Sequence, residues 1–279
     1  MQKSPPSGLV ETQRATVNAW QCDYNHHLNF QFYCREFDQA ARFLALSCGA
    51  DPAGPLPQGR HLRFHAELVA GDIFRVASAR IVDGPHVGSL VHWMSHAGTG
   101  RLIATALDSG APAFACPEVP ESAVASALPR SVEVREGALP FGTMGADGWE
   151  PTARGWVTPD RCTPGGELTE QHLAGMLGDA AGHVWERAGA GVVWVRENGL
   201  GRIAVEAKIT HFAPARAGDL LMLHSRVGPA SGKAVPLQHH LHRLPDGLPI
   251  ARADVTALLI DMKTRKTVPL PSGVRQVSD

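Results

Sequence analysis

The feature that most limits how this chain can fold is an internal repeat. The segment Ala70-Gly71-Asp72-Ile73 recurs as Ala217-Gly218-Asp219-Leu220, and Ile103-Ala104 recurs as Ile250-Ala251. Both recurrences have the same separation of 147 residues. Because similarity at one fixed separation is typical of repeated architecture, the chain is expected to contain two copies of one structural unit.

Each copy has the sequence pattern of a strand, a helix and then several strands. Apolar residues recur at helical spacing over Phe30–Leu44, which predicts an amphipathic helix that ends near Cys48. Asn29 is a favourable N-cap for this helix, and Thr169 stands in the corresponding place in the second half. Alternating apolar residues over Ile203–Ile209 predict a half-buried strand.

The repeat and the linker composition define the expected domains. We predict an α+β protein with units over residues 8–116 and 149–270, because 279 residues with 44% hydrophobic content can form two packed cores. The segment over residues 117–148 is rich in proline and glycine and is the predicted linker.

Composition argues against several classes of protein. A net charge of −1 disfavours a nucleic-acid-binding protein. No apolar stretch reaches transmembrane length and Met1–Ser7 has no hydrophobic signal core, so we expect a cytoplasmic protein without membrane association. Nothing resembles a phosphate-binding glycine loop, and no cofactor is expected.

Cysteines and histidines do not predict a metal site. The cysteines are odd in number and lack the C-x-x-C spacing of zinc ligands: Cys22, Cys34, Cys48, Cys116 and Cys162. The segment His239-His240-x-His242 lies in a predicted strand, where neighbouring side chains point to opposite faces. We expect surface or cleft histidines there.

A dense polar segment lies where the first helix begins. It contains Asp23, Asn25, His26, His27 and Asn29. The positive end of a helix dipole and its unpaired backbone N–H groups favour a bound anion or a polarised carbonyl at this position. The segment is therefore a candidate catalytic or binding site.

The spacing D-x-N-x-H-x-N-x-x-x-Y, from Asp23 to Tyr33, resembles the active-site segment of hot-dog-fold thioesterases. This class includes 4-hydroxybenzoyl-CoA thioesterases and plant acyl-carrier-protein thioesterases. The resemblance implies a long helix wrapped by an antiparallel sheet in each unit, so that one tandem chain takes the place of a dimer. It also implies that Asp23 attacks the thioester or activates water, with Asn25, His27 and Asn29 in support.

The same resemblance extends downstream and includes one departure. The run Arg63-Phe64-His65-Ala66-Glu67 matches the next core strand of the family, and Glu67 matches a second catalytic acid found in some members. Many members carry glycine immediately before the motif histidine, where this chain has His26.

The second half lacks the motif. Thr163 and Gly165 stand in the places of Asp23 and Asn25, and Glu167 stands in the place of His27. We therefore expect one working site per chain. Glu167 or Asp179 could serve a second site in the second half, although we expect Asp179 to be a solvated or capping carboxylate.

Together these features predict an acyl thioester hydrolase that acts on acyl-CoA or an acyl carrier protein thioester. Asp23 is the expected nucleophile or general base, with Glu67 as a further catalytic residue. The remaining expected contacts to substrate come from His26, Asn29 and Tyr33, with the CoA phosphates meeting Arg60, Arg63 or Arg101.

Three alternatives remain open at this point. The first is a hydratase or dehydratase acting on the same thioesters, since one fold supports several chemistries. The second is a non-catalytic acyl-CoA-binding protein, and the third uses Cys22 with a histidine as nucleophile. Assembly of such double hot-dog chains into a homo-oligomer is also left open.

Overall fold

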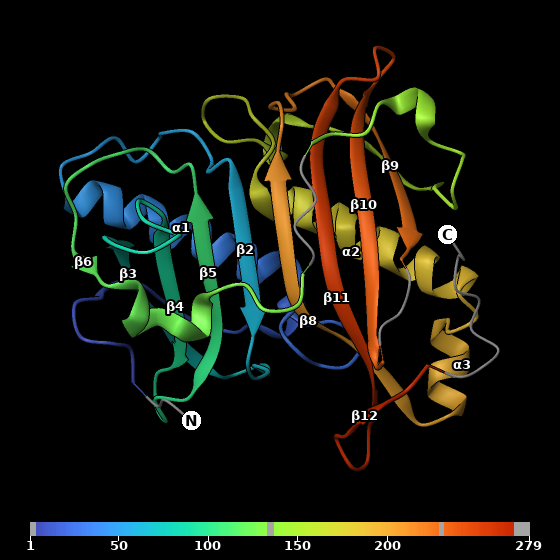
Figure 1. Ribbon diagram of the computed structural model, residues 1–279, viewed down its shortest axis with the longest axis horizontal. Helices are drawn as coiled ribbons and strands as arrows, with labels where there is room; N and C mark the ends of the chain where they lie inside the picture. The colour runs from blue at the N-terminus through green and yellow to red at the C-terminus, as the bar shows by residue number, and fades with distance from the viewer. Residues whose placement is uncertain (1–3, 133–136, 229–231, 271–279) are drawn as a thin grey trace. The chain divides into compact units, whose positions relative to one another are not determined.

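The helix predicted after Asn29 is present as α1 (Phe30–Ser47) (Figure 1). The Asn29 side chain accepts a hydrogen bond from the backbone N–H of Gln31 at 3.2 Å, which confirms its role as N-cap. Cys48 is the C-cap, close to the predicted end of the helix. The buried residues of α1 form one face: Phe32, Tyr33, Cys34, Glu36, Phe37, Ala40, Leu44 and Ala45.

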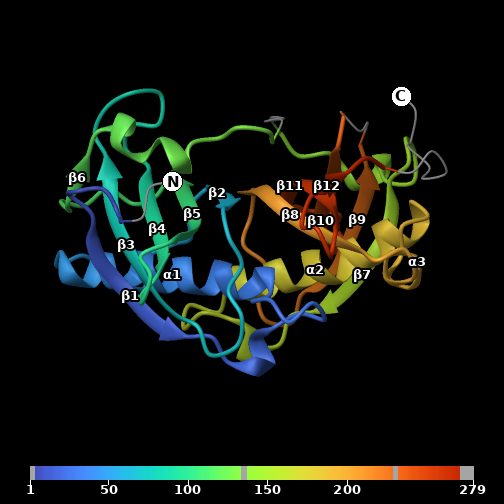
Figure 2. The same cartoon turned by 90° about the horizontal axis from the view of Figure 1, so that it is seen from below.

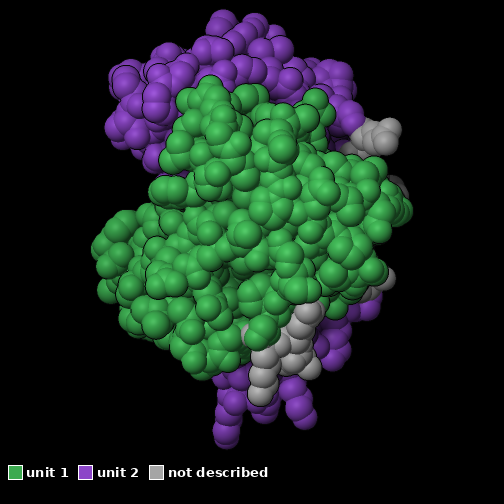
Figure 3. All heavy atoms as spheres, turned by 90° about the vertical axis from the view of Figure 1, so that its left-hand side faces the viewer, with its two compact units in different colours: residues 1–130 green, residues 131–279 purple. Residues whose placement is uncertain are grey.

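The computed structural model describes residues 4–132, 137–228 and 232–270, and the chain divides into compact units over residues 1–130 and 131–279 (Figure 3). In unit 1, α1 packs against one face of an antiparallel sheet (Figure 2). The strand order is β1-β3-β4-β5-β2, and β6 pairs in parallel with β3. The bounds are β1 (Val10–Thr16), η1 (Ala19–Gln21), β2 (Gly59–Phe64), β3 (Ile73–Ile81), β4 (Leu90–His96), β5 (Leu102–Ser109), β6 (Glu118–Val119) and η2 (Glu121–Ala127).

Unit 2 repeats this arrangement with α2 against its sheet. Its strand order is β7-β9-β10-β11-β8, and β12 pairs with β11. The Thr169 side chain accepts a hydrogen bond from the His172 N–H, which confirms Thr169 as the N-cap of α2. The bounds are η3 (Phe141–Thr143), β7 (Glu150–Trp156), η4 (Pro159–Arg161), α2 (Glu170–Arg187), α3 (Val192–Glu197), β8 (Leu200–His211), β9 (Leu220–Val227), β10 (Ala234–Leu244), β11 (Pro249–Asp261) and β12 (Thr267–Val268).

The repeat extends to individual hydrogen bonds. In unit 1, the backbone N–H groups of His65 and Ala66 both donate to the Ile103 carbonyl, at 2.8 and 3.1 Å. In unit 2, the N–H groups of Phe212 and Ala213 donate to the Ile250 carbonyl, at 2.9 and 3.3 Å, with the same separation of 147 residues. Each unit therefore has the long helix and antiparallel sheet predicted for a hot-dog unit.

The predicted linker contributes to both units. Its first part forms β6 and η2, which pack on the sheet of unit 1. Its later part belongs to unit 2, where the Ser131 N–H and hydroxyl both donate to Glu206 Oε2. Proline and glycine content indicated a break in regular structure here, and hydrogen bonds such as these hold parts of the segment on the sheets.

The expectation of surface or cleft histidines in β10 is wrong. His239, His240 and His242 are at most 1% exposed. Neighbours point to opposite faces as expected, since His239 Nδ1 lies 2.7 Å from Ser225 Oγ whereas His240 packs edge-on against Trp149. The segment that precedes β7 covers this second face of the sheet, where Trp149 packs on His240 and Phe141 on His242, and this explains why these two histidines are buried.

Candidate active site at the start of α1

The polar segment before α1 forms a tight loop closed by Asp23. Its Oδ1 accepts hydrogen bonds from the backbone N–H groups of Asn25 and His27, at 2.8 and 3.2 Å. The Asp23 N–H donates to the His27 carbonyl at 2.8 Å, so the loop is held at both ends. Within the described part of the chain, no hydrogen bond engages Oδ2. One carboxylate oxygen therefore fixes the loop, while the other can meet a bound molecule.

His26 occupies the tip of this loop with a positive φ of 64°. This left-handed conformation is costly for most side chains and free for glycine. The corresponding residue of unit 2, Gly166, has a φ of 79°. Both units therefore place a left-handed residue at this position of the loop. The His26 side chain is exposed beside the loop.

Glu67 lies outside the strand in which we expected it. β2 ends at Phe64, and the shared acceptor of His65 and Ala66 produces a bulge that takes the chain out of the ladder. Beyond the bulge, Glu67 Oε2 lies 3.3 Å from His27 Nε2. The structure therefore brings together two of the residues named from the motif, both partly exposed.

Aromatic side chains form a wall beside these polar groups. Phe64 lies 5.9 Å from Phe30 and 5.1 Å from Tyr33, measured between ring centroids. Burial raises the pKa of the Tyr33 hydroxyl above its ordinary value, and the negative charges of Glu67 and Asp23 raise it further. Tyr33 therefore stays protonated and can act as a hydrogen-bond donor. Phe64 was not among the residues we selected, although it lies within the Arg63–Glu67 run.

The arginines expected to meet CoA phosphates have different environments. Arg60 is 0% exposed, and its Nε and Nη2 donate to the two carboxylate oxygens of Asp108 at 2.7 and 2.6 Å. Its proposed surface role is wrong because β2 is buried at this position. Arg63 donates to the Leu128 carbonyl at 3.0 Å, at the end of η2. Arg101 is exposed and donates to the Glu67 carbonyl at 3.1 Å.

Cys22 does not have the environment of a nucleophile. Burial raises the pKa of the Cys22 thiol, and the neighbouring charge of Asp23 adds to this effect. A nucleophilic cysteine needs the opposite shift, because the thiolate is the reactive form. The Sγ atom lies 3.7 Å from the Asn18 carbonyl oxygen. These observations argue against Cys22 as a nucleophile.

The loop of unit 2 has the same backbone with different side chains. The Thr163 N–H donates to the Glu167 carbonyl at 2.7 Å, as Asp23 does to His27. Glu167, in the place of His27, forms an ion pair with Arg216 at 3.0 Å. Asp179 is exposed on α2, as expected for a solvated carboxylate. A loop of this shape therefore forms without the Asp and His of unit 1.

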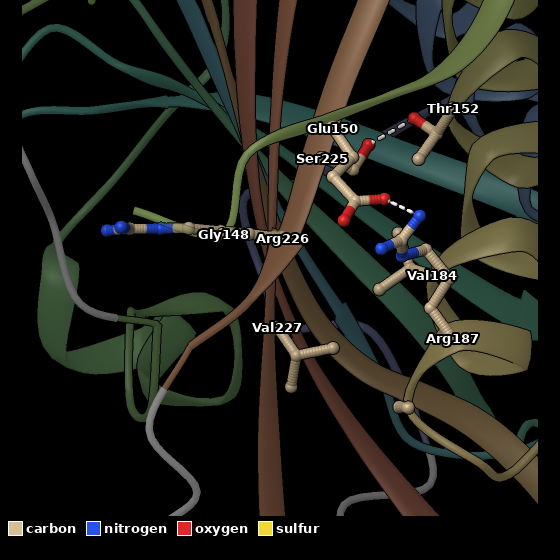
Figure 4. A pocket seen from close by; sticks show the side chains of 9 residues that line it. Gly148, Glu150, Thr152, Val184, Arg187, Ser225, Arg226 and Val227 are labelled. Carbon is tan, nitrogen blue, oxygen red and sulfur yellow. Dashed lines mark hydrogen bonds and ion pairs between the residues drawn. The ribbon is translucent and has the colours of Figure 1, made fainter. Parts of the chain in front are cut away.

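Unit 2 also contains a small pocket of about 140 Å³ (Figure 4). It lies at the C-terminal end of α2, where Val184 and Ala188 face β7 and β9. A Glu150–Arg187 ion pair lies at the pocket. This is the end of the helix opposite to the Thr163 loop, so the pocket is separate from the counterpart of the candidate site.

Two further structural findings concern metals and membranes. Among residues 4–132, 137–228 and 232–270, no group of three or more His, Cys, Asp or Glu side chains could hold a metal ion. Across these same residues, no helix combines the length and the apolar character needed to cross a membrane.

Sequence comparisons identify the family of this chain. A family model for the thioesterase-like superfamily matches residues 17–112 and 157–277. The chain belongs to the thioesterase-like superfamily. The curated protein FadM of Escherichia coli, a long-chain acyl-CoA thioesterase, is 29% identical over 83 residues, which cover 30% of this chain. The match spans 63% of the length of FadM.

Solved structures show the tandem fold. An acyl-ACP thioesterase from Bacteroides thetaiotaomicron has a TM-score of 0.61 at 11% identity, covering 90% of this chain and 98% of its own. The 12:0-ACP thioesterase from Umbellularia californica has a TM-score of 0.58 at 13% identity, covering 89% and 93%. Both matches span the two units, so the prediction of a tandem hot-dog fold is confirmed.

Proposed function

We propose that this protein hydrolyses acyl thioesters at the Asp23 loop, with acyl-CoA or an acyl carrier protein thioester as substrate. The arrangement of Asp23, His27 and Glu67 at the start of α1 carries this proposal. Unit 2 builds the same loop without these side chains, so the backbone does not require them. Membership of the thioesterase-like superfamily and the likeness to FadM support the reaction and the substrate class.

The helix start provides the electrostatics for the reaction. A thioester carbonyl oxygen placed there would be stabilised by the positive end of the α1 dipole. This polarises the carbonyl carbon next to Asp23. The wall of Phe30, Tyr33 and Phe64 would contact the acyl group, because it is the aromatic surface that adjoins the polar residues.

Asp23 can act by two routes at this position. As a nucleophile, its carboxylate attacks the carbonyl carbon, the C–S bond breaks, and water then cleaves the resulting anhydride. As a general base, it takes a proton from the water that attacks the carbonyl carbon directly. Both routes consume one water and release a carboxylic acid and a thiol. His27, paired with Glu67, would donate the proton that the leaving thiolate requires.

Single turnover in isotopically labelled water detects the nucleophilic route when the anhydride opens at the enzyme carbonyl. With enzyme in excess, this opening leaves heavy oxygen in the Asp23 carboxylate and transfers an unlabelled enzyme oxygen to the product acid. The general-base route leaves Asp23 unlabelled and puts one water oxygen into the product, as does opening of the anhydride at the acyl carbonyl. Mass spectrometry of the product and of the peptide that contains Asp23 reports which occurs.

The decisive variant is Asp23→Asn, which keeps the shape of the side chain and removes its charge. We expect turnover of an acyl-CoA to fall by at least ~10²-fold, the scale for loss of a positioned acid or base, with binding largely retained. Thr163→Ala is the matched control, since it changes the corresponding position of unit 2 and should leave turnover nearly unchanged. Near-normal turnover in Asp23→Asn would remove Asp23 from the mechanism.

A panel of acyl-CoAs with a thiol reagent separates this function from the alternatives. Release of CoA supports hydrolysis. Binding without release supports an acyl-CoA-binding protein, and addition of water to an enoyl-CoA without release supports a hydratase.

A further inference from the structure

The hairpin between β4 and β5 places a guanidinium group against the Glu67 segment. Arg101 follows the hairpin turn, and its Nη2 donates to the backbone carbonyl of Glu67 at 3.1 Å. The Arg101 carbonyl accepts a hydrogen bond from the His96 N–H at 2.9 Å, so the hairpin holds the backbone of Arg101 in place. Arg101 therefore links a rigid hairpin to the residue that meets His27.

Other hydrogen bonds hold the same segment, and they recur in unit 2. The Leu68 carbonyl accepts from the Leu28 N–H at 2.8 Å, and the Ala215 carbonyl accepts from the Leu168 N–H at 2.8 Å. The side chain of Asp72 accepts from the Val69 N–H at 3.0 Å, and Asp219 accepts from the Arg216 N–H at 2.8 Å. These shared bonds belong to the fold of each unit.

The contact between Arg101 and Glu67 does not recur. At the separation of 147 residues, Leu248 replaces Arg101 and Pro214 replaces Glu67. The hydrogen bond that closes the hairpin nevertheless recurs, because the Arg243 N–H donates to the Leu248 carbonyl at 2.9 Å, as the His96 N–H does to the Arg101 carbonyl in unit 1. The preceding glycine has a φ of 68° in both hairpins. A hairpin with leucine at this position thus forms the same closing hydrogen bond, which does not depend on the arginine side chain.

We propose that Arg101 is a positioning residue, which holds the Glu67 backbone so that the Glu67 carboxylate meets His27. This inference rests on the proposed function, in which Glu67 and His27 handle the proton of the leaving thiol. The charge of Arg101 also acts on the buried Tyr33 hydroxyl, as do the charges of Asp23 and Glu67, so these groups share one region of unit 1.

The kinetic test uses Arg101→Leu, because unit 2 shows that leucine fits this hairpin. We expect kcat to fall between about 10- and 100-fold, since small misplacement of a reacting group has effects of this size. The loss should be equal for an acyl-CoA and for an acyl thioester of pantetheine, which lacks the nucleotide phosphates. Arg101→Lys, which retains the charge and a donor, should recover part of the loss, and Leu248→Ala should match the wild type.

A second reading of Arg101 predicts a different kinetic pattern. If Arg101 bound the CoA phosphates, the leucine variant would raise KM for acyl-CoA alone and leave the pantetheine thioester unaffected. That result would overturn the positioning role.

A crystal structure of Arg101→Leu tests the proposal without relying on turnover. In the wild type, Glu67 Oε2 lies 3.3 Å from His27 Nε2. If Arg101 positions Glu67, this contact should be lost in Arg101→Leu, whereas Leu248→Ala should retain it.

The contact between His27 and Glu67 decides the matter. Its retention in Arg101→Leu overturns the proposal. A wild-type protein that hydrolyses no thioester would instead overturn the proposed function, and the state of this contact would still decide whether Arg101 positions Glu67.

Discussion

The buried ion pair between Arg60 and Asp108 gives a stability prediction with a defined magnitude. The two side chains are 0% and 1% exposed, and two hydrogen bonds of 2.7 and 2.6 Å join them. Burial alone raises the pKa of the Asp108 carboxyl, but the charge and hydrogen bonds of Arg60, with His92 adding to them, hold it well below its ordinary value. The carboxylate is therefore charged in the core only because its partner is present.

Arg60→Met removes the partner and keeps most of the buried volume. We expect it to lower the free energy of unfolding by about 3–5 kcal/mol at neutral pH, the cost of leaving a buried charge unpaired. In this variant the folded-state pKa of Asp108 should lie above its unfolded value. The loss should therefore grow as pH rises through that range and shrink at acid pH, at about 1.4 kcal/mol per pH unit.

Unit 2 indicates the compensating change. Arg60 pairs with Asp108 across β2 and β5, and the corresponding cross-strand pair in unit 2 is Ala207 with Val255. The double variant Arg60→Met/Asp108→Val should therefore recover to within about 1 kcal/mol of the wild type, or exceed it, because apolar replacement of buried ion pairs is often neutral or stabilising. Only the single variant leaves an isolated charge.

Urea unfolding followed by circular dichroism measures all three proteins. Equal m-values would show that the midpoints report stability rather than a change in the unfolded state. The reasoning is refuted if Arg60→Met costs less than about 1 kcal/mol, or if the double variant is as unstable as the single one.

Two further predictions concern the helix cap and the buried histidines. Asn29→Ala should lower the free energy of unfolding by ~1 kcal/mol through loss of the bond to Gln31, apart from any effect on activity; an unchanged urea midpoint would contradict this. Burial lowers the pKa of His239 from 6.5 to about 4, so the unfolded chain binds a proton more readily than the folded protein between these pH values. The contribution of His239 to the free energy of unfolding should therefore be highest above pH 6.5 and should fall by roughly 3 kcal/mol in total as the pH falls toward 4. Between pH 4 and 6.5 the urea midpoint of the wild type should therefore rise more steeply with pH than that of His239→Gln. Parallel pH profiles of the two midpoints would contradict this prediction.

The fold could be predicted from the sequence because its main signals are local or repeated. The cap at Asn29 and the spacing of apolar residues determine where α1 begins and which face it buries. The separation of 147 residues was sufficient to identify the second unit. Strand bulges carry no comparable signal, and for this reason Glu67 was expected in a strand that ends at Phe64.

The candidate site was harder to predict where it depends on contacts between distant segments. Asp23 and His27 lie in one loop, so their relation follows from their spacing. Arg60 and Arg101 look alike in sequence, yet one pairs with a buried carboxylate and the other holds a backbone carbonyl at the surface. The repeat offered a usable signal, because Gly100-Arg101 aligns with Gly247-Leu248 in otherwise similar hairpins.

The two units together distinguish polar residues that serve the fold from those that serve chemistry. A buried series of hydroxyl and imidazole groups, each 2.7 Å from the next, is Thr12–Ser78–His92 in unit 1 and Thr152–Ser225–His239 in unit 2. In unit 1 the histidine also lies 3.3 Å from Asp108, so the residue types match those of a serine nucleophile with its base and acid. The nucleophile of such a triad must reach substrate, whereas this serine is 0% exposed. Moreover, the series persists in unit 2, where the Asp23 motif is absent, and this is the behaviour expected of a structural network rather than a catalytic one.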